Sequence, residues 1–323
     1  MPSNILVTGG SGAVGTYLVR DLRARGHHVV VADLAHGADK DYVRCDVGEF
    51  RQLERLWLGG GWASGYAASP RQFDLVYHLG AEFGRWNGED YYEQVWRSNA
   101  VGTKNLLRMQ EREGFKAVYF SSSEVYGEYG GVMSEDVMDN TEVRQTNDYA
   151  LSKWVSEMQV MNSARQFSTQ SVRVRLFNTY GPGEWYSPYR SVIGMFCYRL
   201  LHDMPITVYR GHTRTSTYIE DCVRALGSIS ENFSANEVYN IAGDDYHSIE
   251  DAASLIVRLT GREHRVDELL NYQDAEPLTT MHKKVDNTKA KRDLEMQTTV
   301  GLEEGIGRTI EWMKHEYPTT IAT

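Results

Sequence analysis

Three glycines near the start of the chain, Gly9, Gly12 and Gly15, constrain the fold more than any other feature of the sequence. They follow an apolar run at residues 4–8, which is typical of a buried parallel strand, and they open an expected helix at 13–25. Glycines at this spacing permit a tight turn in which amides at the helix N-terminus approach a pyrophosphate. Alone the triplet is weak evidence, because many strand-to-helix turns use glycine for structural reasons.

A carboxylate at the end of the next expected strand strengthens the case for a dinucleotide. Residues 28–33 read as that strand, and Asp33 closes it. At this place a carboxylate can accept hydrogen bonds from the adenosine ribose and repel a 2′-phosphate. Asp46, after a further short run, could meet the adenine edge, with a solvated turn as an equal alternative. The sequence therefore favours NAD over NADP.

Strand and helix signals alternate through the first half of the chain. Further strands are expected at 73–79 and 117–121, and long helices at 91–113 and 148–166. Alternation of this kind predicts an α/β fold with a doubly wound parallel sheet of the Rossmann type. The glycine-rich stretch 59–65 is expected to be a surface loop.

Composition excludes several classes of protein. The net charge is 34 − 44 = −10 without a basic stripe, so nucleic acid is not an expected partner. Three distant cysteines and ten histidines without metal-ligand spacing indicate neither a disulfide framework nor a metal site. The start carries no basic leader, and no apolar run approaches the ~18 residues of a membrane span. The expectation is a soluble cytoplasmic protein without a membrane partner.

Tyr149 and Lys153 lie four residues apart in an expected helix, so their side chains share one face. A neighbouring ammonium favours the phenolate of a tyrosine, whose pKa is ordinarily about 10. Tyr149 is therefore a candidate base for an alcohol proton, and a dinucleotide would accept the hydride. The pair alone is common on helices, so it gains its meaning from the glycine turn.

Together these motifs resemble the extended short-chain dehydrogenase/reductase family, which includes NAD-dependent sugar-nucleotide epimerases, dehydratases and decarboxylases. Further segments match the family in order across nearly the whole chain, namely 78–81, 99–103, 121–127, 175–182 and 213–221. The resemblance implies an enzyme, a lyase or an isomerase, that retains and recycles NAD and acts on a nucleotide-diphosphate sugar. It implies an NAD-binding Rossmann domain at 1–177, to which 212–242 returns. The smaller C-terminal substrate-binding lobe would comprise 178–211 and 243–323.

The resemblance also implies a role for each matching residue. Retained NAD would oxidise the sugar at C4, Tyr149 would take the hydroxyl proton, and Lys153 would hold the cofactor ribose. Asn178 and Arg214 would position the diphosphate, as suits an arginine fork. The expected catalytic residues are Ser122, Ser123, Glu124, Tyr149 and Lys153. The expected cofactor-binding residues are Gly9, Gly12, Ala13, Val14, Gly15, Asp33, Asp46, Val47, Leu79, Gly80, Ala81, Asn99, Tyr149 and Lys153. The expected substrate-binding residues are Glu82, Ser122, Asn178, Arg190 and Arg214.

Glu124 is the residue on which the choice of reaction depends. A carboxylate beside Ser122 could remove the C5 proton of a 4-keto sugar, which would permit loss of water from C6. Related 4-epimerases more often carry a small or neutral residue there, and many dehydratases carry Asp where this chain has Ser123. The Ser-Ser-Glu triplet also resembles uronate decarboxylases, which generally add a late arginine where this chain offers Lys283 and Lys284. The order of preference is 4,6-dehydration, 4-epimerisation, then decarboxylation. A non-catalytic NAD-binding sensor is the alternative from another class.

Family members usually dimerise through two long helices, which here would be 91–113 and 148–166, so a homodimer is expected. Trp154, Met158 and Met161 lie at helical spacing and could form part of that seam. An equal alternative is that they face the core of their own subunit.

Overall fold

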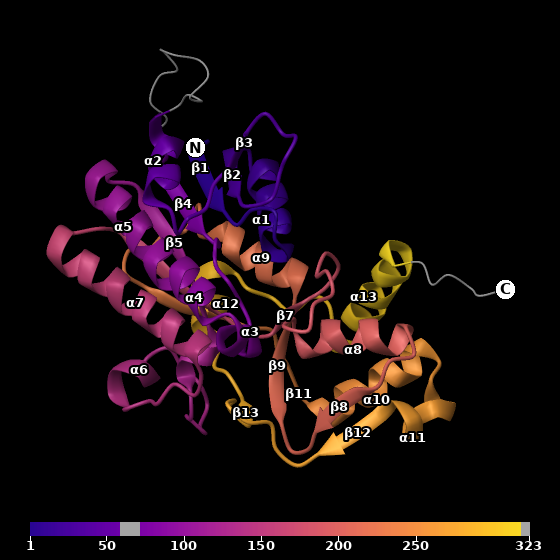
Figure 1. Ribbon diagram of the computed structural model, residues 1–323. Coiled ribbons are helices and arrows are strands. Elements are labelled where there is room, and N and C mark those ends of the chain that lie inside the picture. Colours follow the sequence, from indigo (N-terminus) through magenta and orange to yellow (C-terminus); the bar gives the residue numbers. More distant parts are fainter. Residues whose placement is uncertain (59–71, 318–323) are drawn as a thin grey trace.

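The structure is a computed structural model that describes residues 1–58 and 72–317 (Figure 1). Its centre is a sheet of seven parallel strands in the order β10-β6-β5-β4-β1-β2-β3. The strands are β1 (Asn4–Thr8), β2 (His28–Asp33), β3 (Tyr42–Arg44), β4 (Leu75–His78), β5 (Lys116–Ser122), β6 (Ser171–Leu176) and β10 (Val238–Ile241). This arrangement confirms the predicted doubly wound α/β fold. The loop expected at 59–65 lies outside the described residues.

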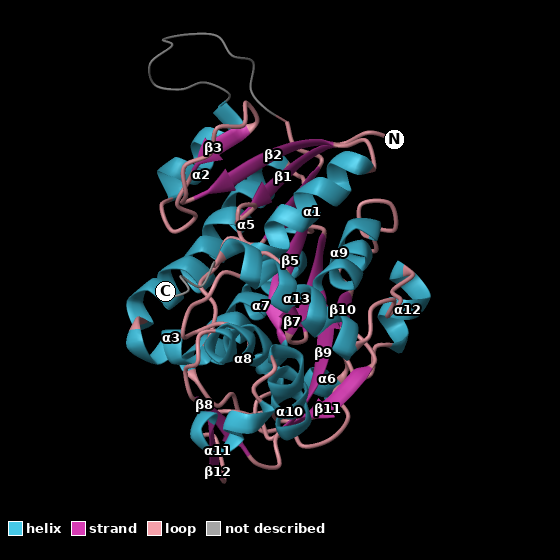
Figure 2. Ribbon diagram, turned by 90° about the vertical axis from the view of Figure 1, so that its right-hand side faces the viewer, coloured by secondary structure: helices cyan, strands magenta, loops and turns pink. Residues whose placement is uncertain are grey.

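Alternate residues of the strands pack against helices on opposite faces of the sheet. In β1, Ile5 and Val7 belong to one hydrophobic cluster and Leu6 to another. The first cluster includes α1 (Ala13–Ala24) and α9 (Ile219–Ser228), which Figure 2 shows side by side. The second includes α2 (Phe50–Leu58) and α5 (Gly102–Glu113), and α7 (Asp148–Phe167) packs beside α5. Burial on both faces explains why the strands read as continuous apolar runs.

The helix expected at 91–113 is interrupted by a π-helical turn. It consists of α4 (Tyr92–Trp96), the π-helix η1 (Arg97–Val101) and α5, preceded by α3 (Arg85–Asp90). Within η1 the hydroxyl of Ser156 on α7 donates to the carbonyl of Asn99 at 3.0 Å. That carbonyl is therefore engaged by a neighbouring helix, which is a recognised setting for a π-bulge.

The smaller lobe combines short strands with three packed helices. Strand β9 (Thr213–Tyr218) lies between β11 (Asp245–Ser248) and β13 (His282–Lys283) and also pairs with β7 (Thr179–Tyr180). A second sheet joins β8 (Ile206–Tyr209) to β12 (Leu270–Gln273). The three packed helices are α8 (Val192–Leu201), α10 (Ile249–Thr260) and α13 (Leu302–Glu316). The other short elements of the chain are α6 (Val137–Asn140), α11 (Val266–Leu269), α12 (Thr288–Leu294) and the 3₁₀ helices η2 (Ser123–Tyr126) and η3 (Glu263–Arg265).

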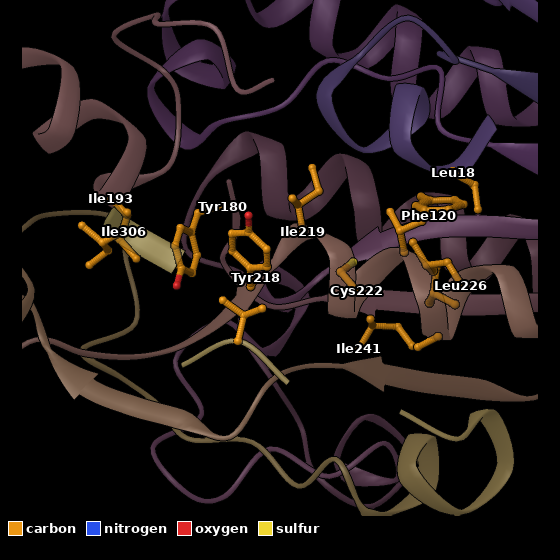
Figure 3. Close-up of a cluster of buried hydrophobic side chains, with 14 of the residues drawn as sticks. Leu18, Phe120, Tyr180, Ile193, Tyr218, Ile219, Cys222, Leu226, Ile241 and Ile306 are labelled. Atoms are coloured by element: carbon orange, nitrogen blue, oxygen red, sulfur yellow. The ribbon is translucent and has the colours of Figure 1, made fainter. Parts of the chain in front are cut away.

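The segment 212–242 divides between the two parts of the molecule. Strand β10 belongs to the large sheet and helix α9 packs against it, whereas β9 pairs within the sheet of the smaller lobe. Figure 3 shows one buried cluster running from Leu18 and Phe120, through Tyr218, to Ile193 and Ile306. The lobe and the sheet thus share a core, and the proposed domain boundaries stay a prediction.

Aromatic side chains join the loop before α8 to the C-terminal helix. The rings of Tyr186 and Tyr198 stack with centroids 3.8 Å apart, and Trp185 meets Trp312 of α13 edge-on at 5.3 Å. The backbone amide of Tyr186 donates to the Tyr317 hydroxyl at 2.9 Å. We call these five residues the aromatic anchor; it holds the loop against both helices.

The outer face of α7 carries exposed apolar side chains, including Leu151 and Met158, whereas Trp154 packs partly against its own core. The homodimer stays a prediction. Across residues 1–58 and 72–317, no helix combines the length and apolar character needed to cross a membrane.

Candidate active site

A cavity of about 850 Å³ opens between the carboxyl edge of the large sheet and the lobe. The ends of β1, β4 and β5 meet at this edge, which brings the glycine turn, residues 79–82 and residues 122–124 to one wall. Residues 178–214 supply much of the opposite wall. Every predicted site residue except Asn99 lines the cavity.

The glycine turn has the shape required for close approach of a pyrophosphate. Gly9 has φ +70°, and a Cβ there would come within 2.7 Å of the Gly80 amide nitrogen. A Cβ on Gly15 would overlap the Gly9 carbonyl oxygen. Helix α1 begins after Gly12, which has no side chain to cap the first amides. The cradle therefore fits the predicted dinucleotide.

Asp33 and Asp46 both line the cavity, and their contacts with a dinucleotide stay a prediction. Asp33 accepts hydrogen bonds from the amides of Ser11 at 2.9 Å and Ala35 at 3.3 Å. Asp46 accepts from the Gly48 amide at 2.8 Å and from Arg97 at 3.0 Å. The amides on Asp33 fix its carboxylate beside the glycine turn.

Asp33→Ser is expected to weaken NAD binding and to narrow the preference for NAD over NADP, because the variant no longer repels a 2′-phosphate. Calorimetric titration with both cofactors measures the two affinities. Asp41→Ser is the matched control, since Asp41 is a nearby carboxylate outside the cavity. Equal affinity of the unmodified protein for NAD and NADP would refute the prediction.

Asn99 lies behind the cavity wall instead of in it. Its amide Oδ1 accepts from the Glu82 amide at 2.9 Å, and its Nδ2 donates to the Glu82 carbonyl and to the Ser152 hydroxyl. With its side chain bonded to the backbone of residue 82, Asn99 holds the loop after β4 against α7. We assign it a supporting role in place of the expected cofactor contact.

Burial dominates the electrostatics of Tyr149 and Lys153. The Lys153 ammonium donates to the Phe120 carbonyl at 2.9 Å, and burial lowers the pKa of Lys153 to about 7. Burial raises the pKa of Tyr149 to about 12, against the opposing effect of a hydrogen bond with Ser122. This direction differs from the sequence expectation, because desolvation opposes the phenolate and weakens the charge of the lysine.

Glu124, whose side chain is 18% exposed, forms an ion pair with the buried Lys283. The amide of Glu124 donates to the Ser122 hydroxyl at 3.2 Å, so the two side chains share the end of β5. Burial favours the neutral acid, but Lys283 and Arg214 outweigh it and hold the pKa of Glu124 below its usual value. Glu124 Oε1 meets Lys283, whereas the buried Oε2 has no hydrogen-bond partner among the described residues.

Three of the expected substrate residues, Asn178, Arg190 and Arg214, belong to the wall formed by residues 178–214. Asn178 donates to the Thr215 carbonyl at 2.9 Å, and Arg214 donates to the Met281 carbonyl at 3.0 Å. The Arg190 guanidinium lies 4.0 Å from the centroid of the Phe83 ring. Glu82, Ser122 and Ser123 also line the cavity.

Four further residues were not predicted as members of the site, namely Arg85, His212, Glu276 and Lys283. The first three line the cavity, and Lys283 lies buried behind Glu124. The sequence shows lysines near residue 283, but no local pattern indicates that Lys283 contacts Glu124, 159 positions away.

The model of one protein family matches residues 5–242, which is most of the chain and includes the glycine turn and helix α7. Its description is "NAD dependent epimerase/dehydratase family". The chain belongs to this family. Membership confirms the resemblance found in the sequence, the enzymatic character and NAD as the cofactor.

Curated relatives of this epimerase/dehydratase family member carry different activities. A UDP-N-acetyl-alpha-D-glucosaminuronate decarboxylase of Bacillus cytotoxicus is 28% identical over 97% of this chain and 98% of its own. A dTDP-glucose 4,6-dehydratase of Neisseria gonorrhoeae is 24% identical over 96% of this chain and 95% of its own.

Solved structures show the same fold over nearly the whole chain. The epimerase Mth375 of Methanothermobacter thermautotrophicus has a TM-score of 0.85 and 25% identity, over 98% of this chain and 93% of its own. A UDP-glucuronic acid 4-epimerase of Bacillus cereus, solved with UDP-glucuronic acid and NAD, has a TM-score of 0.80 and 25% identity, over 97% of this chain and 100% of its own. The relatives therefore include all three reactions considered from the sequence.

Proposed function

We propose that this protein decarboxylates a nucleotide-diphosphate uronate through a transient 4-keto intermediate. The observation that carries the proposal is the ion pair between the buried Lys283 and the partly exposed Glu124, beside Ser122. The proposal departs from the order of preference drawn from the sequence, which placed 4,6-dehydration first. The Bacillus cytotoxicus decarboxylase, similar over almost its full length, supports the change.

Dehydration makes two demands that this site meets poorly. It needs a base for the C5 proton, but Glu124 is paired with Lys283 and its pKa is lowered, which makes it a weak base. It also needs an acid to protonate the hydroxyl that leaves C6. Ser123 lies where many dehydratases carry Asp, and a serine hydroxyl is too weak an acid for that task.

Decarboxylation needs the opposite proton transfer at C5. A 4-keto uronate is a β-keto acid, so its C5–C6 bond can break without a base, leaving the electron pair on the C4 oxygen as an enolate. C5 must then receive a proton. Burial lowers the pKa of Lys283, so its ammonium can supply that proton. The proton passes through the Glu124 carboxylate to C5 in one concerted transfer, because Glu124 with its lowered pKa does not retain it. Solvent restores the proton to the pair after each turnover.

Tyr149 and Ser122 act on the C4 oxygen throughout. Tyr149 takes the hydroxyl proton during oxidation, hydrogen-bonds the enolate oxygen, and returns the proton when the alcohol forms again. The Ser122 hydroxyl, paired with the phenol, holds that oxygen in place. NAD, which the glycine turn and Asp33 would hold, would supply the acceptor and then the donor of the C4 hydride.

The experiment is to incubate the protein separately with UDP-glucuronate, UDP-N-acetylglucosaminuronate, UDP-glucose and dTDP-glucose and to weigh the products. We expect loss of carbon dioxide from a uronate and, in deuterium oxide, one deuterium at C5 of the pentose. Loss of water from a glucose nucleotide would establish the dehydratase and refute the proposal. A uronate or glucose nucleotide converted without a change of mass would indicate a 4-epimerase.

Lys283→Met should lower decarboxylation by about 10²–10⁴-fold, the usual effect of removing a proton-transfer group. The variant should still reduce bound NAD on mixing with substrate, because Tyr149 is intact; nicotinamide absorbance reports this step. Glu124→Gln should behave in the same way. Lys284→Met is the matched control, since Lys284 is exposed and outside the cavity. Full turnover by Lys283→Met would contradict the proton path.

A further inference from the structure

Three residues from distant parts of the chain meet on the cavity wall. Arg85 begins α3, His212 precedes β9, and Glu276 lies in the segment between β12 and β13 (Figure 1). The Glu276 carboxylate pairs with Nη2 of Arg85. The backbone amide of Glu276 donates to Nε2 of His212 at 3.2 Å. Glu276 therefore holds both of the other side chains.

The hydrogen bond on Nε2 fixes the tautomer of His212. Because Nε2 accepts, the ring proton of the neutral imidazole is on Nδ1. Burial, together with the charge of Arg214, lowers the pKa of His212, which favours this neutral form. His212 is 2% exposed, and its Nδ1 is a buried donor with no partner among the described residues.

Arg85 presents a second donor of the same kind. Its Nη2 is used by Glu276, but its Nε is buried and has no hydrogen-bond partner in residues 1–58 and 72–317. Arg85 also packs against the Trp86 ring at 5.2 Å, which restricts the guanidinium plane. Buried donors without acceptors are rare in folded proteins, so two of them on one cavity wall indicate ligand oxygens.

We propose that Arg85 and His212 donate hydrogen bonds to the phosphate oxygens of the substrate's diphosphate, with Glu276 as the positioning residue. This inference rests on the nucleotide-sugar substrate of the proposed function. Arg214 is near enough to lower the pKa of His212, so the three side chains converge on one region. A guanidinium, an imidazole N–H and a second arginine suit a group that is anionic and offers several acceptor oxygens.

Glu276 explains how these donors stay in place before a ligand binds. Its carboxylate balances the Arg85 charge, which would otherwise be uncompensated in a partly buried site. This pairing uses Nη2 of Arg85 and leaves its buried Nε without a partner among the described residues. The donors are thus preorganised for phosphate oxygens, and the Arg85–Glu276 pair carries no net charge before a ligand binds.

The test measures binding of UDP and of uridine to the NAD-loaded protein by calorimetry, with Arg85→Gln and His212→Phe as variants. We expect each variant to bind UDP about tenfold more weakly, as for a lost hydrogen bond to a charged group. The affinity for uridine, which has no phosphate, should not change. Where dTDP binds the unmodified protein more tightly than UDP, dTDP and thymidine replace them.

Arg210→Gln and His282→Phe are the matched controls, since both residues neighbour the cluster but lie outside the cavity. Thermal melting checks the fold of every variant; if His212→Phe fails to fold, Arg85→Gln decides the result. An unchanged affinity for UDP in the variants would overturn the proposal. So would an affinity for uridine that falls as much as the affinity for UDP, or the absence of any binding of UDP and dTDP to the unmodified protein. Nucleotide affinity does not depend on which product forms, so a wrong reaction assignment and a wrong phosphate contact give separate results.

Discussion

Tyr149→Phe is expected to lower turnover by about 10²–10⁴-fold, because in the proposed reaction the phenol exchanges a proton with the C4 oxygen. The substitution keeps the aromatic ring, and so the packing of a buried side chain. The affinity for UDP should be unchanged. The measurements are kcat and the nicotinamide absorbance in a single turnover, in which the variant should not reduce bound NAD.

The same phenol predicts a pH dependence. Burial raises the pKa of Tyr149 to about 12, so the phenolate fraction, and with it kcat/KM, should rise with pH through the neutral range. Tyr126→Phe is the matched control, since Tyr126 is a buried tyrosine whose hydroxyl bonds Asn240 and Arg175 outside the cavity. Reduction of bound NAD by Tyr149→Phe at the unmodified rate would contradict the assigned role.

Glu157→Ala is expected to destabilise the protein by about 3–5 kcal/mol, the effect of leaving one partner of a buried ion pair uncompensated. Glu157 is fully buried and accepts two hydrogen bonds of 2.9 Å from Arg175, which is 1% exposed. It also accepts a hydrogen bond from the hydroxyl of Ser121, which precedes Ser122 at the end of β5. Urea unfolding of the variant and the unmodified protein measures the change in free energy.

Two variants separate this effect from a general loss of charge. Glu304→Ala removes the exposed partner of Arg308 and should change stability by only about 0–1 kcal/mol. The double variant Glu157→Leu with Arg175→Met removes both buried charges and should be more stable than Glu157→Ala. A loss below about 1 kcal/mol in Glu157→Ala would show that the pair is not a stability determinant.

Local patterns were enough to predict much of the fold. The run before Gly9, the amphipathic stretch after it and the carboxylate at Asp33 each lie within a few residues of the element they define, and β1, α1 and β2 follow them. The Ser248 hydroxyl caps α10 by accepting a hydrogen bond from the Asp251 amide at 2.9 Å, a contact between residues three positions apart. Periodicity and capping report neighbours along the chain, so these predictions needed no tertiary information.

The features that the sequence missed depend on contacts between distant segments. The π-helical turn depends on a hydroxyl from α7, and Asn99 turns away from the cavity because the backbone at residue 82 offers it two partners. The contact between Lys283 and Glu124 depends on the pairing of β13 with β9 in the folded chain. The same tertiary burial reversed the expected direction of the Tyr149 pKa.

The aromatic anchor has a consequence for how the cavity can open. The loop at 181–191 contributes Arg190 to the cavity wall, and a mobile flap in that place would admit substrate by itself. Stacking with Tyr198 and the bond to Tyr317 instead tie this wall to two helices of the lobe. This wall of the cavity is therefore continuous with the packed helices of the lobe and is not free to move as a separate flap.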